Sequence, residues 1–457
     1  MKKIKYILFG ILLVSITSCE LMGNIDDIQP ENVLTDETLV SDKNSAEAAV
    51  NGVYSSWRSI DIGWFTSLMS MRSHAENFRY IGGYQGFAEN DIKVENIGVE
   101  KNYTALYRVI NIANSVLAQL EGEFVEGLEA ARQTEMIAEL KFHRAMAHFH
   151  LLRQFGEFWD ATSEYGVVTY TEPVRSNTPK QRESVGAVYE LIVNDLNAVI
   201  SDAPVFPKGH YYVSQTTGKA LLARVKLYQG AYPQAAQLAG EVIAEAPGAG
   251  YMLEEVYFDV FRNAAKSSEV LFSLYASYPN EPTSMNITNL KVGDTSKRIA
   301  DEMVEGDMVY DARYTDAYIN AASKYVQNDY ASGEMANTHF FIRLAEMYYI
   351  LAEAEARQSH FDEARLALAA ICERAGYAQE EIEAIPNALV LEQILKHKWM
   401  ELNTENNEEW YDLVRYHVID DYVIAPDYVA SDKLLTLPIP RSAMAGNNLL
   451  KQNKGYE

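Results

Sequence analysis

The sequence predicts an all-α protein: a scaffold of stacked helical hairpins that supports a loop-rich, mixed lobe for binding a ligand. Apolar residues recur at the three- and four-residue spacing of amphipathic helices over most of the first 246 residues and again after residue 340. The segments with this pattern are 45–58, 102–121, 135–153, 185–200, 217–246, 340–375 and 389–416. Between 247 and 338 the pattern weakens, and Gly, Pro, Asn and Ser lie among aromatic residues, which favours loops and short elements.

Two of the helical segments share an internal repeat. A turn residue, an aromatic residue and an alanine recur at matching spacing: Gly230, Tyr232 and Ala235 in one segment, Ser359, Phe361 and Ala364 in the other. Pro247 and Gly376 then occupy matching positions further along. Because small residues let paired helices pack closely, this pattern predicts tetratricopeptide-like hairpins. We expect an N-terminal helical region over 38–246 and a C-terminal region over 247–457 packed on the same scaffold.

The N-terminus has the features of an export signal. Residues 1–18 run from lysines through a short apolar stretch to small residues, and Cys19 follows directly. The cysteine in this position resembles a bacterial lipobox, in which it is acylated and becomes the first residue of the mature protein. We therefore predict a signal peptide over 1–18, lipidation at Cys19, and a flexible, acidic linker over 19–37.

The overall charge narrows the classes of ligand. The formal net charge of -25 repels the phosphates of nucleic acid, so no nucleic-acid partner is expected. It favours solubility and neutral or cationic ligands. The two cysteines, Cys19 and Cys372, cannot form a disulfide framework. Cys372 lies in an apolar run and is interpreted as a core residue.

No catalytic or cofactor pattern is present. His143, His148 and His150 lack the spacing of a zinc-binding helix and are interpreted as ordinary helical residues. The Gly-rich stretch at 82–86 does not fit a dinucleotide fingerprint, and Asp307, Asp311 and Asp316 do not have calcium-loop spacing. The sequence therefore predicts a binding protein, not an enzyme, with no cofactor.

One segment, 57–87, has the composition of a ligand surface. Aromatic residues alternate there with polar residues and glycines, and the predicted ligand contacts are Trp64, Arg72, Asn77, Tyr80 and Tyr84. A sugar ring offers an apolar face to an aromatic side chain and hydroxyls to polar ones, although a peptide could use the same groups. The alternative is that Trp57 and Phe65 belong to the core. Tyr211–Tyr212 and Tyr275–Tyr278 are weaker candidates.

Several motifs together resemble the SusD/RagB family over nearly the whole chain. The helical motifs are Ala46 to Tyr54, Asn102 to Leu120, Ala138 to Gly156, and Arg343 to Ala354. The C-terminal motifs are Glu401-Leu402, Glu405, Trp410, Asp412-Leu413, Arg415, Leu437 to Pro440, and Gln452 to Tyr456. The sequence departs from the family pattern at Asn406, Glu408 and Lys454, which we interpret as structural positions.

This resemblance implies a surface lipoprotein of the outer membrane that acts as a lid on a SusC-like, TonB-dependent transporter and binds without catalysis. Glycans are the usual ligands of the family, while RagB-type members take oligopeptides. No ligand-binding residue carries over by motif. A tetratricopeptide-type adaptor and a surface hydrolase are further alternatives, which the lipobox and the absence of a catalytic pattern respectively disfavour.

Overall fold

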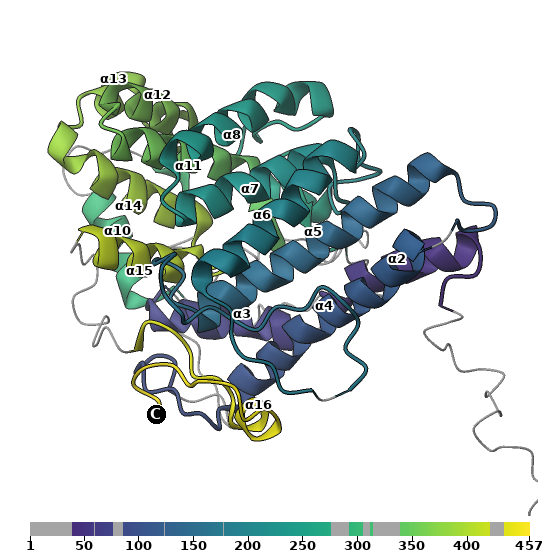
Figure 1. Cartoon of the computed structure of the whole chain (residues 1–457). Helices are drawn as coiled ribbons and strands as arrows, with labels where there is room; N and C mark the ends of the chain where they lie inside the picture. Colours follow the sequence, from purple (N-terminus) through teal and green to yellow (C-terminus); the bar gives the residue numbers. More distant parts are fainter. Residues whose placement is uncertain are drawn as a thin grey trace, which may run out of the picture.

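The computed structural model describes residues 39–58, 60–75, 86–122, 124–176, 178–275, 292–304, 311–313, 339–420 and 434–457 (Figure 1). Helices dominate these residues. The helices are α2 (Lys43–Ser56), α3 (Ile60–Arg72), α4 (Ile97–Gly122), α5 (Ala130–Phe155), α6 (Val185–Asp202), α7 (Gln215–Tyr228), α8 (Tyr232–Glu245), α9 (Asp259–Asn263), α10 (Asp294–Val304), α11 (Leu344–Arg357), α12 (Phe361–Cys372), α13 (Gln379–Glu383), α14 (Val390–Leu402), α15 (Glu408–Asp420) and α16 (Arg441–Gly446). One antiparallel pair of strands joins β1 (Val270–Ser273) to β2 (Phe340–Arg343).

The helices stack as the sequence predicts. Helix α5 packs between α4 and α6, α7 packs between α6 and α8, and α11 packs between α8 and α12 (Figure 1). The contact between α8 and α11 continues the stack from the N-terminal half of the chain into the C-terminal half. The prediction of an all-α, tetratricopeptide-like scaffold is therefore confirmed. Helix α3 is not among the predicted helices, because its residues fall within the predicted ligand surface at 57–87.

The internal repeat corresponds to two similar hairpins, α7–α8 and α11–α12. Gly230 and Ser359 both adopt left-handed backbone, with φ of 72° and 65°, at the turn of each hairpin. The alanines of the repeat, Ala235 and Ala364, are completely buried, which allows the paired helices to approach closely. The predicted match of Gly376 with Pro247 is wrong, because Gly376 follows a short 3₁₀ turn in left-handed conformation and so corresponds to Gly250.

Charged residues of the C-terminal motifs form buried ion pairs inside the stack. Arg343 Nε lies 2.6 Å from Glu405 Oε2, and Arg343 Nη1 lies 3.1 Å from Glu401 Oε1. Arg415 pairs with Glu353 at 2.7 Å. A buried charge without its partner is strongly destabilising, so these motif residues hold α11, α14 and α15 in register.

The C-terminal segment packs against the end of α5. The Asn453 amide donates to the carbonyl oxygens of Phe155 (2.8 Å) and Leu437 (2.6 Å). Arg182 donates to the Asn453 side-chain oxygen at 2.6 Å and to the Phe155 carbonyl at 2.7 Å. The end of α5 and the C-terminal segment, which are far apart in sequence, therefore meet at one buried polar junction.

Candidate functional site

Most of the predicted site lies outside the described residues. Cys19, Asn77, Tyr80 and Tyr84 are among the residues that the structure does not describe. Trp64 lies within α3. The prediction that these residues bind a lipid or a ligand stays a prediction.

Arg72, at the end of α3, lies inside the protein. Its side chain is 1% exposed, and the guanidinium carbon lies 3.9 Å from the ring centre of Trp410. Arg72 Nε donates to Asn90 Oδ1 at 2.8 Å, and burial lowers the pKa of Arg72 to about 10. Arg72 was expected at a ligand surface, but the structure buries its side chain against Trp410. This geometry supports a role in holding α3 against α15.

The aromatic residues on either side of the predicted surface belong to the core. Trp57 is completely buried, and its Nε1 donates to His143 Nδ1 at 3.1 Å. Phe65 and Phe87 are buried and meet edge to face, with ring centres 5.8 Å apart. The end of α3 is tied to the loop-rich lobe, because the Gly293 N–H donates to the Ala75 carbonyl at 2.9 Å.

A small cavity walled by tyrosines lies next to the end of α2. Its volume is about 140 Å³. The described residues that line it are Asn51, Tyr54, Ser55, Arg58, Tyr211, Tyr212, Ser273, Leu274 and Tyr275. They come from α2, from the connection between α6 and α7, and from the end of β1. We call this space the tyrosine cavity. It includes Tyr211, Tyr212 and Tyr275 from the weaker candidates of the sequence.

The rings of the tyrosine cavity form a continuous row. Tyr211 lies 4.7 Å from Tyr275 and 4.9 Å from Tyr212 between ring centres, and Tyr212 lies 5.3 Å from Tyr54. The Tyr54 hydroxyl donates to Glu139 Oε2 at 2.6 Å and accepts from the Val213 N–H at 3.0 Å. Burial and the negative charge of Glu139 raise the pKa of Tyr54 well above its ordinary value, so this wall stays neutral and fixed.

Ser273 is a further residue in the lining of the cavity. Its side chain is 1% exposed, and its hydroxyl has no hydrogen-bond partner among the described residues. The hydroxyl oxygen itself is closed off from solvent, so the cavity offers a ligand mainly its tyrosine rings. Such aromatic faces suit a sugar ring. Sequence reasoning missed Ser273 and Tyr54, because the strand and helix patterns around them are those of ordinary core elements.

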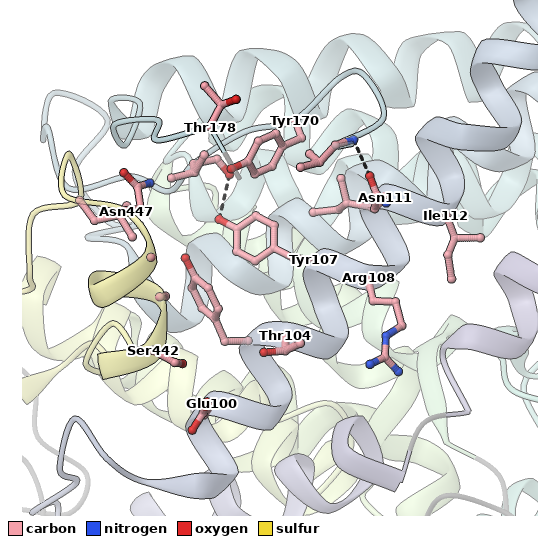
Figure 2. Close-up of a pocket in the computed structure, with 17 residues that line it drawn as sticks. Glu100, Thr104, Tyr107, Arg108, Asn111, Ile112, Tyr170, Thr178, Ser442 and Asn447 are labelled. Atoms are coloured by element: carbon pink, nitrogen blue, oxygen red, sulfur yellow. Dashed lines mark hydrogen bonds between the residues drawn. The ribbon is translucent and has the colours of Figure 1, made fainter. Parts of the chain in front are cut away.

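A larger groove of about 690 Å³ runs along α4 (Figure 2). Its walls come from α4, from the connection between α5 and α6, and from α16 with the residues after it. Tyr103, Tyr107 and Tyr170 provide its aromatic surface, and Figure 2 shows the rings of Tyr107 and Tyr170 next to each other. We call it the α4 groove. Sequence reasoning missed it, because its walls come together only in the fold.

The described residues contain neither a metal cluster nor a membrane-crossing helix. No group of three or more His, Cys, Asp or Glu side chains in these residues is placed to hold a metal ion. None of the described helices combines the length and hydropathy needed to cross a membrane. His143, His148 and His150 are buried in α5, and burial lowers the pKa of His143 to about 3.

Two family models match different parts of the chain. The one described as the SusD family matches residues 291–436. The one described as "Starch-binding associating with outer membrane" matches residues 26–228. Together they cover most of the chain, and the stacked helical scaffold agrees with them. The chain belongs to the SusD/RagB family.

Relatives and solved structures carry the same family name. SusD-like protein P25 of Formosa agariphila is 24% identical over 290 residues, which are 60% of this chain and 52% of that protein. A SusD-like protein of Bacteroides ovatus is 27% identical over 207 residues, covering 44% of this chain and 35% of that protein. The matches thus span about half the length of these curated relatives, or less.

The fold is shared over most of the chain with proteins of known structure. A SusD superfamily protein from Bacteroides thetaiotaomicron is 21% identical with a TM-score of 0.74, covering 90% of this chain and 99% of that chain. A protein described as a laminarin-binding SusD-like protein is 21% identical with a TM-score of 0.70, covering 91% of this chain and 100% of that chain.

Proposed function

We propose that this protein is a surface-exposed, nutrient-binding lipoprotein. It captures an oligosaccharide and delivers it to a SusC-like, TonB-dependent transporter in the outer membrane, without catalysis. The observation that carries the glycan part is the row of tyrosine rings that walls the tyrosine cavity. The family description that names starch binding and the laminarin-binding relative of like fold support the same ligand class.

The chemistry of the cavity suits a sugar better than an ion. Tyrosine rings present flat apolar faces to the C–H groups of a pyranose, while polar side chains such as Asn51 can bond its hydroxyls. A site built to bond hydroxyls discriminates against molecules that lack them. An oligopeptide would compete for the same groups and is the alternative that the binding experiment separates.

Isothermal titration calorimetry with malto- and laminari-oligosaccharides tests this function. We expect micromolar or weaker binding, and Tyr275→Ala should weaken it about tenfold without changing the melting temperature. Tyr232→Ala, on α8 and outside the cavity lining, is the control and should bind normally. Binding of oligopeptides with no response to either glycan would contradict the proposal.

The anchor and the transporter need a separate test in cells. Replacing Cys19 with Ser should release the protein from the outer membrane, because the lipid chains would no longer be attached. Pull-down of the wild-type protein in mild detergent should recover a large TonB-dependent barrel. Membrane retention of the Cys19→Ser variant, or recovery of the lipoprotein alone while the transporter is expressed, would count against this part.

A further inference from the structure

We propose that the α4 groove is a second oligosaccharide-binding site, which holds a short stretch of a neutral glycan. This inference rests on the proposed glycan-binding function. The volume of about 690 Å³ falls within the range of small-molecule sites and exceeds that of the tyrosine cavity. The two spaces share none of their described lining residues, so they are separate sites.

The aromatic surface of the groove is arranged as facets at different angles. The ring centres of Tyr103 and Tyr107 lie 4.8 Å apart with planes at 59°, and those of Tyr107 and Tyr170 lie 5.8 Å apart at 81°. Successive sugar rings in a glycan also turn relative to one another. Several tilted faces therefore suit a short, bent chain of sugars better than a single flat ligand.

The walls of the groove are held in place before any ligand arrives (Figure 2). The Tyr107 hydroxyl donates to the Val168 carbonyl at 2.9 Å, and the Val174 N–H donates to Asn111 Oδ1 at 2.7 Å. On the opposite wall, the Asn447 amide donates to the Lys180 carbonyl at 2.6 Å. Three separate elements are thus fixed around the space, which lowers the entropic cost of binding.

Polar groups in the groove remain available to a ligand. Among the described residues, neither the Tyr170 hydroxyl nor the Asn111 amide nitrogen has a recorded hydrogen-bond partner, and the same holds for the Ser442 hydroxyl. These groups come from all three walls. All three can donate to the hydroxyls along the edge of a sugar chain, and the two hydroxyls can also accept from them.

The charges of the groove favour a neutral ligand. Glu100 and Arg108 line it from the same helix and carry opposite signs. Burial raises the pKa of Tyr103 to about 12 and raises that of Tyr107 well above its ordinary value, so both rings stay neutral. An anionic or cationic ligand would meet one like charge for each opposite one, whereas a neutral glycan meets no such penalty.

Binding stoichiometry tests this second site. With a malto- or laminari-oligosaccharide that binds the wild-type chain, calorimetry should give two molecules per chain. Tyr170→Ala and Thr104→Trp should each remove one of them, because the first deletes an aromatic face and the second fills the groove from an exposed position of α4. Ala118→Trp, exposed on the same helix outside the groove, is the matched control.

The outcomes separate the two proposals. A double variant, Tyr170→Ala with Tyr275→Ala, should bind glycan at least about tenfold more weakly than the wild-type chain while keeping the wild-type melting temperature. Loss of the remaining binding by Tyr170→Ala in a Tyr275→Ala background supports the groove. A single site per chain that Tyr275→Ala abolishes and Tyr170→Ala and Thr104→Trp leave intact overturns the groove and leaves the proposed function standing. A wild-type chain that binds no glycan overturns both.

Discussion

Glu408 shows how a departure from the family pattern is accommodated at a single residue. Its side chain is 3% exposed, Oε1 accepts from Arg153 Nη1 at 2.6 Å, and Oε2 accepts from the Tyr228 hydroxyl at 2.9 Å. Although burial alone would raise it, the charges of Arg224 and Arg153 hold the pKa of Glu408 well below its ordinary value. The carboxylate therefore compensates two buried arginines from α5 and α7.

Neutralising this carboxylate should destabilise the protein severely. Glu408→Gln removes the carboxylate that pairs with Arg153, while Arg224 keeps its pair with Glu346, so the free energy of unfolding should fall by about 3–5 kcal/mol in urea denaturation. Glu363→Gln, at an exposed position of α12, should change it by less than about 0.5 kcal/mol. A loss below about 1 kcal/mol for Glu408→Gln would show that the pair is not a main support of the stack.

At the scale of elements, the two repeat hairpins make a matched pair of turns. The residues after Gly230 and Ser359, which are Ala231 and His360, have nearly the same backbone angles, with φ of -83° and -86° and ψ of 60° and 66°. One turn thus uses glycine and the other uses a serine, which bears the steric cost of left-handed backbone.

Exchanging the residue types should shift stability in opposite directions. Gly230→Ala should lower the free energy of unfolding by about 1 kcal/mol, because alanine resists a φ of 72°. Ser359→Gly should raise it by up to about 1 kcal/mol, because the strain at φ of 65° is removed. Chemical denaturation of the two variants measures both changes. The same sign for both would contradict the equivalence of the hairpins.

The elements of the scaffold were predictable because each carries its own pattern. The three- and four-residue periodicity located α4, α5 and α6 and both hairpins. The break between α14 and α15 was not predictable from periodicity. Thr404, Asn406 and Asn407 all have positive φ there, which is a local feature without a periodic signal.

The candidate sites were only partly predictable, for a physical reason. Tyr54, Tyr212 and Tyr275 come from three distant segments, and only the packing of α2 against the lobe brings their rings together. Aromatic composition identified Tyr212 and Tyr275, but it also selected Arg72, which the structure buries against Trp410. Composition alone does not distinguish an aromatic residue that faces solvent from one that packs in the core.

For the whole molecule, buried histidines make stability depend on pH. Burial lowers the pKa of His143, His148 and His397, each to about 3 from an ordinary value of 6.5. Below pH 6.5 the unfolded chain takes up protons that the folded chain does not, so the folded state loses stability as the pH falls. Above pH 6.5 this contribution is fully present.

Melting temperatures should therefore fall steadily as the pH is lowered from 6.5 to 4.5. Each buried histidine contributes up to about 1.4 kcal/mol per pH unit in that window. His143→Gln keeps an acceptor for Trp57 and should make the pH dependence of the melting temperature shallower by the contribution of about one histidine. A pH dependence unchanged by His143→Gln would mean that this histidine titrates normally in the folded protein.

The polar junction at Asn453 has a consequence for the order in which the protein folds. Asn453 bonds to the Phe155 carbonyl across 298 residues of sequence, and Arg182 bonds to Asn453 across 271. Closing such long loops is slow, because the chain loses much freedom before any contact rewards it. The packing at the end of α5 is therefore completed only when the C-terminal segment docks, even if helix α5 itself forms early. During synthesis the first half of the chain therefore lacks the hydrogen bonds that Asn453 supplies. Until the C-terminal segment docks, the chain is not fully folded and is easier to unfold, as passage through an export channel would require.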